Sequence, residues 1–236
     1  MTYTIYRFLI LIGRIFSSIR FLTNIIAVWF YKLFRSNKTF RFQNRNYPYF
    51  YHIYNNTIAG ERIVEVPLIK GFLDDYKGQR ILEIGNVLSH YFRVGHDILD
   101  KYEHGKHIIN KDIVGFRPNH PYDLIISIST LEHIGYEYGE QYDPKKILRV
   151  IAHTKTLLCR GGLFVATLPY GYNTFVTRLI QKNTLPFDKL IYLKRISYAG
   201  EWRVTTRLGA IRSGLYDSHY ANAQAVCVGI YKKKSR

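Results

Sequence analysis

The stretch RILEIGNVLSHY, residues 80–91, predicts the fold of this chain. Its apolar residues Ile81, Leu82 and Ile84 indicate a short buried strand, which carries the acid Glu83 and turns at Gly85. Such a strand is typical of a parallel sheet and delivers a loop to a ligand. Because ligands in open α/β sheets bind beyond the carboxyl ends of the strands, we expect this loop to form the floor of a pocket.

Four further apolar runs follow, joined by helical or loop segments: HDILD (96–100), HIIN (107–110), YDLIISIS (122–129) and LFVATL (163–168). This alternation predicts a doubly wound α/β sheet. A last run at residues 224–231 is expected to join the edge of the sheet. Before the first strand, Pro67 is expected to begin a helix, with Glu61 and Glu65 on a solvated face; the less favoured alternative places them at the mouth of the pocket.

The ordered set of segments resembles the class I S-adenosylmethionine-dependent methyltransferases of the type 11-like group. The matching pieces are ILEIG (81–85), ILD (98–100), KDI (111–113), YDLIISISTLEHIG (122–135) and LLCRGGLFVATLPYG (157–171). The resemblance implies a Rossmann-like seven-stranded, mostly parallel sheet with an antiparallel last strand, and S-adenosyl-L-methionine as cofactor. The first loop departs from the family pattern, because Val87 and Ser89 occupy positions where the family has glycine.

The resemblance and the strand ends together predict the cofactor-binding residues. They are Glu83, Gly85, Asn86, Asp100, Glu103, Asp112, Ile113 and Ser129. The resemblance places Glu83 near the ammonium end of the cofactor, or in the organisation of the loop, and Asp112 with Ile113 at the adenine. For the ribose diol, strand geometry favours Asp100, whereas counting residues from the glycine favours Glu103.

His133, in the Leu-Glu-His segment, is the candidate general base, because the pKa of a histidine lies near neutrality. The alternative is a histidine that holds the loop structure. Tyr170 and Asn173 follow the fifth strand and are candidates for substrate contact, although turn chemistry alone explains Asn173. Substrate-recognition elements are expected at about residues 172–216, within a methyltransferase-like domain over 61–236.

Residues 1–36 form a strongly apolar arm, and the chain contains no acid before Glu61. Apolar residues alternate with arginine and lysine in a pattern typical of a helix that lies in a membrane interface. A spanning helix and a helix packed on the domain are the alternatives. A spanning helix would place Arg14 or Arg20 in the bilayer, at a cost of about 2.5–3.5 kcal/mol each. Residues 37–60 are predicted to be a basic, aromatic linker that becomes ordered against the domain.

The composition limits the partners. A formal net charge of +17 over 236 residues favours an anionic membrane surface, nucleic acid or acidic glycans. Cys159 and Cys227 lie in apolar segments and predict buried thiols rather than a disulfide. The nine histidines do not show zinc-ligand spacing, so we expect no metal site.

These observations predict an enzyme that O-methylates a small polar acceptor, a glycan or a lipid-linked precursor at the cytosolic face of a membrane. The alternative is a catalytically inactive module of the same fold that binds an anionic membrane or, less favoured, nucleic acid. A nicotinamide-dependent oxidoreductase is disfavoured, because the first loop lacks the Gly-x-Gly-x-x-Gly spacing.

Overall fold

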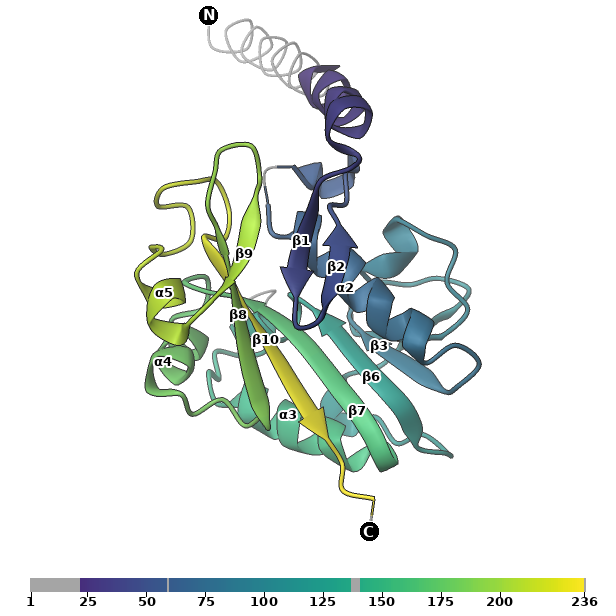
Figure 1. Cartoon of the computed structure of the whole chain (residues 1–236). Coiled ribbons are helices and arrows are strands. Elements are labelled where there is room, and N and C mark those ends of the chain that lie inside the picture. Colours follow the sequence, from purple (N-terminus) through teal and green to yellow (C-terminus); the bar gives the residue numbers. More distant parts are fainter. Residues whose placement is uncertain (1–21, 59, 137–140, 236) are drawn as a thin grey trace, which may run out of the picture.

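The computed structural model describes residues 22–58, 60–136 and 141–235. Most of the predicted membrane arm, residues 1–21, lies outside this part of the chain. The described residues form a central sheet with helices on both faces, and the N-terminal helix projects from one end of the domain (Figure 1).

The central sheet has eight strands in the order β5-β4-β3-β6-β7-β10-β8-β9. Their bounds are β3 Ile81–Ile84, β4 Asp97–Asp100, β5 Ile108–Asn110, β6 Tyr122–Ile128, β7 Leu158–Pro169, β8 Lys189–Arg195, β9 Trp202–Thr205 and β10 Ala225–Lys232. The first five strands of this sheet pair in parallel, and β10 is antiparallel to both of its neighbours. The prediction of a Rossmann-like, mostly parallel sheet with an antiparallel last strand is therefore confirmed.

Two details of the sheet differ from the prediction. β9 adds an eighth strand, which pairs with β8 at the edge. β10 was expected at the edge but lies between β7 and β8. Its first five residues, 225–229, are all buried. A continuous apolar run is typical of a strand covered on both faces, and that condition is met inside a sheet rather than at its edge.

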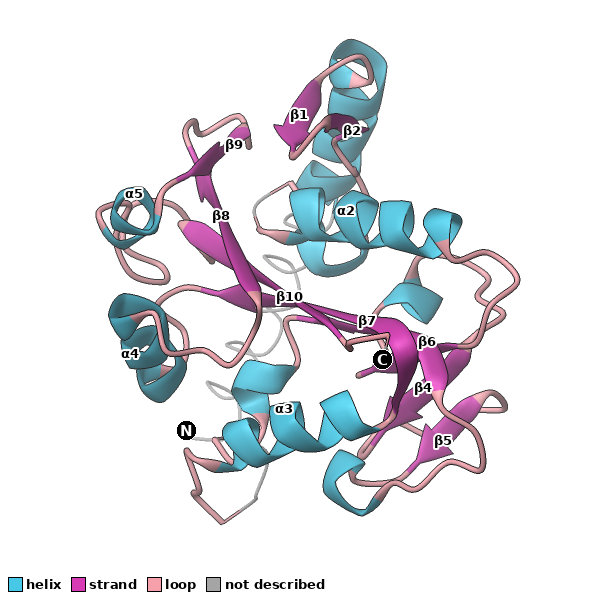
Figure 2. Ribbon diagram, turned by 60° about the horizontal axis from the view of Figure 1, so that its bottom comes forward, coloured by secondary structure: helices cyan, strands magenta, loops and turns pink. Residues whose placement is uncertain are grey.

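Helices cover the sheet from two sides (Figure 2). On one side lies α2, Arg62–Asp75, and on the other lie α3, Lys146–Thr156, and α4, Thr174–Lys182. α5, Arg207–Ile211, packs beside β8. Short 3-10 helices complete the layers: η1 Tyr54–Asn56, η2 Leu88–His90, η3 Ile113–Gly115 and η4 Leu131–His133. Two buried apolar clusters result, one on each face of the sheet.

α2 begins at Arg62, five residues before the expected start at Pro67. A proline inside a helix has no N–H to donate to the carbonyl four residues earlier. That carbonyl belongs to Ile63, and it accepts a hydrogen bond from the backbone N–H of Phe50 instead, at 3.0 Å. The proline is accommodated because the preceding segment satisfies the freed oxygen, and the same bond ties that segment to α2.

Residues 37–60, predicted as a linker, fold against the domain. They form the hairpin of β1, Thr39–Phe42, and β2, Arg45–Pro48, followed by η1. Phe40, Phe42 and Tyr49 are buried in the cluster beneath α2. The Tyr49 hydroxyl accepts a hydrogen bond from the backbone N–H of Trp202 at 2.8 Å and donates to the backbone carbonyl of Trp202 at 3.2 Å. The aromatic residues of this segment therefore belong to the core of the domain.

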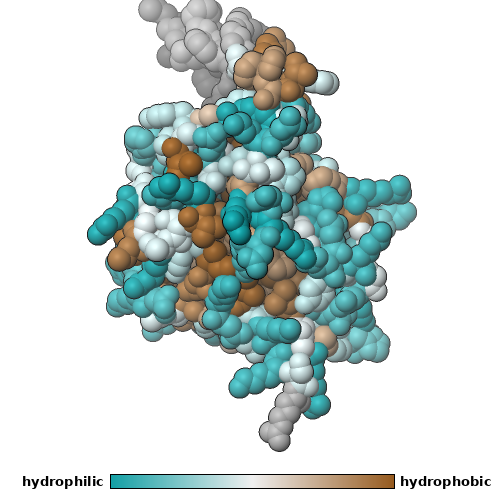
Figure 3. Space-filling model, in the orientation of Figure 1, coloured by the Kyte–Doolittle hydropathy of each residue, from teal (hydrophilic) through white to brown (hydrophobic). Residues whose placement is uncertain are grey.

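The N-terminal helix, residues 22–35, has one buried and one exposed apolar side. Val28 is buried, Tyr31 packs edge-on against Tyr51, and Arg35 pairs with Glu201 at 2.9 Å. The exposed apolar residues recur at helical spacing: Leu22, Ile26, Trp29, Phe30, Leu33 and Phe34, each at least 54% exposed. Figure 3 shows apolar residues of this helix at the surface, beside the grey part of the chain.

Candidate functional site

The loops that follow neighbouring strands meet at one cavity of about 430 Å³. This volume falls in the range of small-molecule sites. Eight of the eleven predicted site residues line the cavity: Gly85, Asn86, Asp100, Glu103, Asp112, Ile113, Ser129 and His133. The cavity lies beyond the carboxyl ends of β3, β4 and β6, where open α/β sheets bind ligands.

Gly85 makes the turn at the floor of this cavity. Its φ is +86°, a left-handed conformation that side chains other than glycine rarely adopt. A Cβ added there would lie 2.5 Å from Cγ2 and 2.9 Å from Cβ of Thr130. The Gly85 N–H donates to the Leu99 carbonyl at 2.9 Å, which joins the turn to the end of β4. Both the backbone conformation and the space therefore require glycine.

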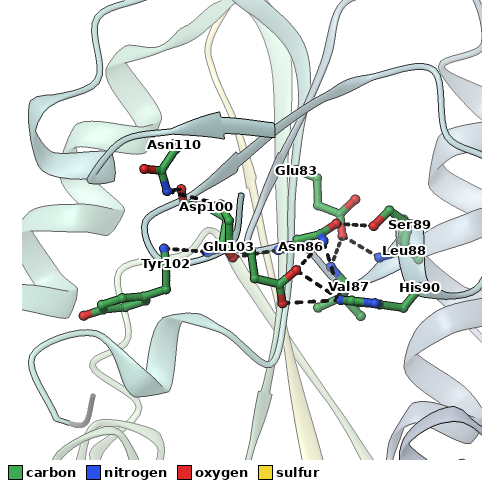
Figure 4. A network of polar contacts seen from close by, with 10 residues as sticks. All are labelled: Glu83, Asn86, Val87, Leu88, Ser89, His90, Asp100, Tyr102, Glu103 and Asn110. Carbon is green, nitrogen blue, oxygen red and sulfur yellow. Dashed lines mark hydrogen bonds and ion pairs between the residues drawn. The ribbon is translucent and has the colours of Figure 1, made fainter. Parts of the chain in front are cut away.

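Glu83 holds the loop from behind and does not line the cavity. Its buried carboxylate accepts from the backbone N–H groups of Val87 and Leu88 at 2.9 and 2.8 Å (Figure 4). Its other oxygen lies 2.8 Å from Nε2 of His96. Because the Glu83 side chain is fully buried behind the loop and away from the cavity, the structure supports the loop-organising role rather than contact with a cofactor.

Asp100 and Glu103 reach the cavity from the end of β4. Oδ1 of Asp100 accepts from the N–H groups of Tyr102 and Glu103, both at 2.8 Å, and Oδ2 accepts from the Asn86 N–H at 3.0 Å. A carboxylate has about four acceptor positions, so Oδ2 keeps one for a ligand. Glu103 accepts from Nδ2 of Asn86 at 2.6 Å and is partly exposed. Asn86 thereby joins the two acids into one network (Figure 4).

Asp112 lies on the opposite wall, at the start of η3. Its Oδ1 accepts from the Val114 N–H at 3.0 Å and caps η3, while Oδ2 lies 3.1 Å from Nζ of Lys146 and 3.4 Å from Nζ of Lys101. Desolvation raises the pKa of the Asp112 carboxyl, but the hydrogen bonds from Val114 and Lys146 outweigh it and hold the pKa below its usual value. Ile113 beside it is buried and adds an apolar surface.

A second cavity of about 250 Å³ adjoins the first. Asn55, Arg62, Ser129 and His133 line both cavities and form the boundary between them. The further lining of the second cavity includes Glu61, Glu132, Tyr172, Tyr216 and Asn222. The site is therefore a pair of connected spaces, one built from strand ends and one from the start of α2, η4 and two later loops.

Ser129 occupies a strained position at this boundary. Its φ of +39° is unusual for a residue other than glycine. Hydrogen bonds hold the conformation: its N–H donates to the Thr167 carbonyl at 3.1 Å, and its hydroxyl donates to Oε1 of Glu65 at 2.6 Å. Backbone strain that is held by several partners clusters at functional sites. Ser129 is thus positioned by β7 and α2 together.

Three glutamates are buried at or beside the second cavity, and one arginine there is partly buried. Glu61 and Glu65 were expected on a solvated face of the helix, and this prediction is wrong, since Glu61 is 8% and Glu65 1% exposed. Arg62 pairs with Glu65 at 2.6 Å. Desolvation lowers the pKa of Arg62, but the charges of Glu65 and Glu61 outweigh it and raise the pKa. The helix start turns these charges inward, toward the sheet.

Glu132 is the third buried acid. It is 1% exposed, and its two carboxyl oxygens accept no hydrogen bond within the described residues. A histidine nitrogen, Nε2 of His133, lies 3.8 Å from Oε1 of Glu132. Desolvation raises the pKa of Glu132 well above its usual value, with a further rise from the charge of Glu65. Burial likewise raises the pKa of Glu61.

His133 lies at the boundary of the two cavities, where a general base would act. Its Nδ1 lies 3.3 Å from the Tyr172 hydroxyl, and the two rings meet edge-on with centroids 4.9 Å apart. Tyr172 packs edge-on against Tyr216 in turn. This position is compatible both with the predicted role as a base and with a role in holding the loop, because the same contact orients the imidazole.

Tyr170 and Asn173 do not line either cavity. Tyr170 is buried in the core, and its hydroxyl accepts from Nε2 of Gln181 at 2.9 Å. Asn173 caps α4 and donates from Nδ2 to the Glu132 carbonyl at 2.6 Å. The prediction that these two residues contact substrate is not supported, because their polar groups serve the fold. The neighbouring Tyr172 faces the second cavity instead.

Sequence reasoning missed several cavity residues, chiefly Arg62, Glu132, Tyr172 and Tyr216. Glu132 stands within the Leu-Glu-His segment, so its position was noticed while its burial was not. Arg62 carried a weaker signal, as a basic residue between two acids at the start of a helix. Tyr216 carried no signal that separates it from the other twenty tyrosines.

Comparisons with known proteins give likenesses of structure alone. Neither the models of known protein families nor the curated protein sequences match the chain. The N-methyltransferase NodS from Bradyrhizobium japonicum, in complex with S-adenosyl-L-homocysteine, is 15% identical, with 73% of this chain and 87% of that chain covered and a TM-score of 0.43. An rRNA methylase from Streptococcus thermophilus is 10% identical, with 72% and 97% covered and a TM-score of 0.42.

A magnesium protoporphyrin IX methyltransferase from Synechocystis with bound S-adenosylmethionine is 11% identical, with 71% of this chain and 76% of that chain covered and a TM-score of 0.37. These identities and TM-scores are too low to carry function from those proteins to this one. The function of this chain is therefore inferred from its own residues.

Proposed function

We propose that this chain is a methyltransferase that binds S-adenosyl-L-methionine in the first cavity and a small polar acceptor in the second. The observation that carries the proposal is the convergence of Gly85, Asp100 and Asp112 on one cavity of about 430 Å³. These residues follow three different strands, yet they present a glycine turn and two carboxylates to one space. That combination suits a nucleoside with a charged tail.

The residues present fit this cofactor. Gly85 lines the cavity without a side chain, and its positive φ gives the turn that brings the backbone to the ligand. Oδ2 of Asp100 and the partly exposed Glu103 offer acceptors to a ribose diol. Asp112 offers an acceptor, and Ile113 an apolar surface, to a purine ring. We assign the ribose to Asp100 and Glu103 and the adenine to Asp112 and Ile113.

When bound, the cofactor supplies a methyl group on a cationic sulfur. This chain then has three tasks: to orient the acceptor in the second cavity, to exclude water and to accept a proton. Methyl transfer is an in-line displacement, which depends chiefly on positioning and on a dry site. Ser129 and His133 lie where the two cavities meet. His133 is therefore placed to take a proton from the acceptor at its imidazole.

The acceptor expected from the sequence is a hydroxyl or carboxyl group of a glycan or a lipid-linked precursor. Its small, polar character agrees with a cavity of about 250 Å³ lined by glutamates and tyrosines. A carboxylate acceptor agrees less well, because it would meet Glu61 and Glu132 at close range. We therefore propose that the acceptor is a small polar molecule.

Calorimetric titration of the full chain tests the cofactor assignment. We expect S-adenosylmethionine and S-adenosylhomocysteine to bind and NAD not to bind. Gly85→Arg should abolish binding, and Asp100→Ala should weaken it. Gly78→Arg is the matched control, because Gly78 has a similar positive φ but nothing within 4 Å of an added Cβ. Binding of NAD alone would refute the proposal and favour the oxidoreductase, whereas binding of no nucleoside at all would refute it and favour the inactive module.

We also propose that the N-terminal helix lies on an anionic membrane surface. The exposed apolar face of residues 22–35 supports this, together with the absence of acids before Glu61 and the net charge of +17. Amphipathic helices with aromatic residues and flanking basic residues bind at the headgroup level of bilayers. Within residues 22–58, 60–136 and 141–235, no helix has the length and hydropathy that a bilayer span requires.

Flotation with lipid vesicles tests the membrane proposal. We expect the full chain to float with vesicles that contain phosphatidylglycerol, and less with neutral vesicles or at high salt. Trp29→Glu should reduce flotation, because Trp29 is 69% exposed on the apolar face. Leu208→Glu is the control, an exposed apolar residue on α5. Equal flotation of both variants would show that the helix is not the contact, and stronger retention on single-stranded RNA would favour nucleic acid.

A further inference from the structure

The second cavity has a charge opposite to that of the whole protein. The chain carries a net charge of +17, yet Glu61 and Glu132 line this cavity, Glu65 is buried beside it, and Arg62 is the one arginine among the described residues of its lining. The buried Arg195 also acts on Glu61, but its guanidinium lies outside the lining and donates to the Ser197 and Tyr198 carbonyls. Arg62 and the Ser129 hydroxyl already bind the two oxygens of Glu65, at 2.6 Å each. The charge of Arg62 is therefore directed to Glu65, and Glu61 and Glu132 face the cavity without an ion pair of comparable length.

Glu132 gives a second, independent sign of a ligand. It lines the cavity, it is 1% exposed, and both of its carboxyl oxygens are without a hydrogen bond in the described part of the chain. A buried carboxylate in this state is costly to the fold unless a partner arrives. Such a group is retained where a bound molecule supplies the missing donor. The nearest imidazole nitrogen, 3.8 Å away, is too far to supply it.

We infer that the acceptor is an amine that enters the second cavity as a cation, with Glu132 and Glu61 as its counter-charges. This inference rests on the proposed methyltransferase function and names its acceptor class. It replaces the oxygen acceptor expected from the sequence with a nitrogen acceptor. An organic cation is favoured over a metal ion, because no three acidic, histidine or cysteine side chains in the described residues are arranged to hold a metal.

The aromatic lining agrees with a cationic guest. Tyr172 and Tyr216 line the cavity with rings 5.0 Å apart in an edge-on arrangement. Tyrosine rings attract ammonium groups through their faces, most strongly where water is excluded. A carboxylate beside an aromatic wall is also the pairing that recognises an ammonium and rejects a hydroxyl of equal size, since only the ammonium balances the charge.

The reaction step balances without any further reagent. The ammonium first gives one proton to the carboxylate of Glu132, which burial makes a better base than a glutamate in water. The neutral amine nitrogen then attacks the methyl carbon, a new N–C bond forms, and the S–C bond breaks with its electron pair returning to sulfur. The product is an N-methylammonium ion, which can leave as a cation or lose a second proton to His133.

Binding of matched probes to the protein saturated with S-adenosylhomocysteine tests this inference. Each of two probe sets contains an amine, a neutral hydroxyl compound and a carboxylate of similar size. The first set is 2-phenylethylamine, 2-phenylethanol and phenylacetate, and the second is glucosamine, glucose and glucuronate. We expect the amine of at least one set to bind at least tenfold more tightly than its neutral and anionic counterparts, at constant ionic strength. An equal or reversed order in both sets would overturn the inference. The titration with S-adenosylhomocysteine beforehand shows separately whether the cofactor site exists.

A substitution locates the effect. Glu132→Gln should reduce the affinity for the preferred amine at least tenfold, while the affinity for S-adenosylhomocysteine stays the same. Asp74→Asn is the control, an exposed carboxylate of α2 far along the helix from Glu61. Should Glu132→Gln fold poorly, Glu61→Gln provides the second test. If both single variants fold and each binds the amine as tightly as the native protein does, the assignment of the counter-charges is overturned.

Discussion

Replacement of Gly85 by alanine tests the geometry on which the cofactor site depends. Gly85 and Gly78 have nearly the same φ, +86° and +83°. An added Cβ at Gly85 would lie 2.5 Å from Cγ2 of Thr130, whereas at Gly78 it would meet nothing within 4 Å. The two alanine variants therefore differ in the steric contact and not in the backbone strain.

The expected magnitudes follow from these two contributions. A residue with a Cβ in the left-handed region costs about 1–2 kcal/mol, and both variants carry this cost. An atom forced into a filled space costs about 1–3 kcal/mol more, and Gly85→Ala alone carries it. Since 1 kcal/mol shifts the melting temperature of a domain of this size by about 2–4 °C, Gly85→Ala should melt roughly 2–12 °C below Gly78→Ala.

Urea unfolding measures the free-energy difference, and calorimetric titration with S-adenosylhomocysteine measures binding by the folded variants. Gly85→Ala should lose binding beyond its loss of stability, because the loop must move away from Thr130 or into the cavity. A second substitution, Thr130→Gly, removes the atoms that clash and should recover part of both losses. Equal stability of the two alanine variants, with binding intact in both, would refute the proposed geometry of this turn.

Three further changes test the surrounding structure. Desolvation raises the pKa of the Glu132 carboxyl in the native state. Between about pH 4 and that raised pKa, the native state therefore binds more protons than the unfolded chain does. The free energy of unfolding falls as the pH rises through this window. Glu132→Gln should therefore melt above the native protein at pH 8, with the difference shrinking toward pH 4.5 in thermal scans; no change at pH 8 would contradict a buried ionised form. Tyr49→Phe leaves the buried Trp202 N–H without its partner and should cost about 1–3 kcal/mol in urea unfolding, whereas the exposed Tyr198→Phe should cost little. Glu83→Gln removes the negative charge beside His96 and weakens the two hydrogen bonds from the loop N–H groups to this side chain. We expect the free energy of unfolding to fall by about 1.5–3 kcal/mol and the cofactor to bind more weakly. An unchanged cofactor affinity would argue against the loop-organising role.

The parallel strands and the residues at their ends could be predicted from the sequence. Short apolar runs, each followed by an acid or a glycine, are local patterns, and a parallel sheet places the ends of its strands at one edge whatever the rest of the chain does. For this reason the sequence pattern predicts Gly85 and Asp100 at the site, whereas Asp112 was expected there from the family resemblance. Their convergence follows from the sheet alone.

Only the tertiary structure decided the second cavity. Glu61 and Arg62 come from the start of α2, Glu132 from η4, and Tyr172 and Tyr216 from loops more than 80 residues after Glu61 in the sequence. Whether a glutamate is solvated or buried depends on what packs over it, and here the packing of α2 on β6 and the loops after β7 determines it. The position of β10 inside the sheet has the same origin. Burial is a property of segments that meet in space, so the residues that set the charge of the acceptor cavity became visible only once those segments were in place.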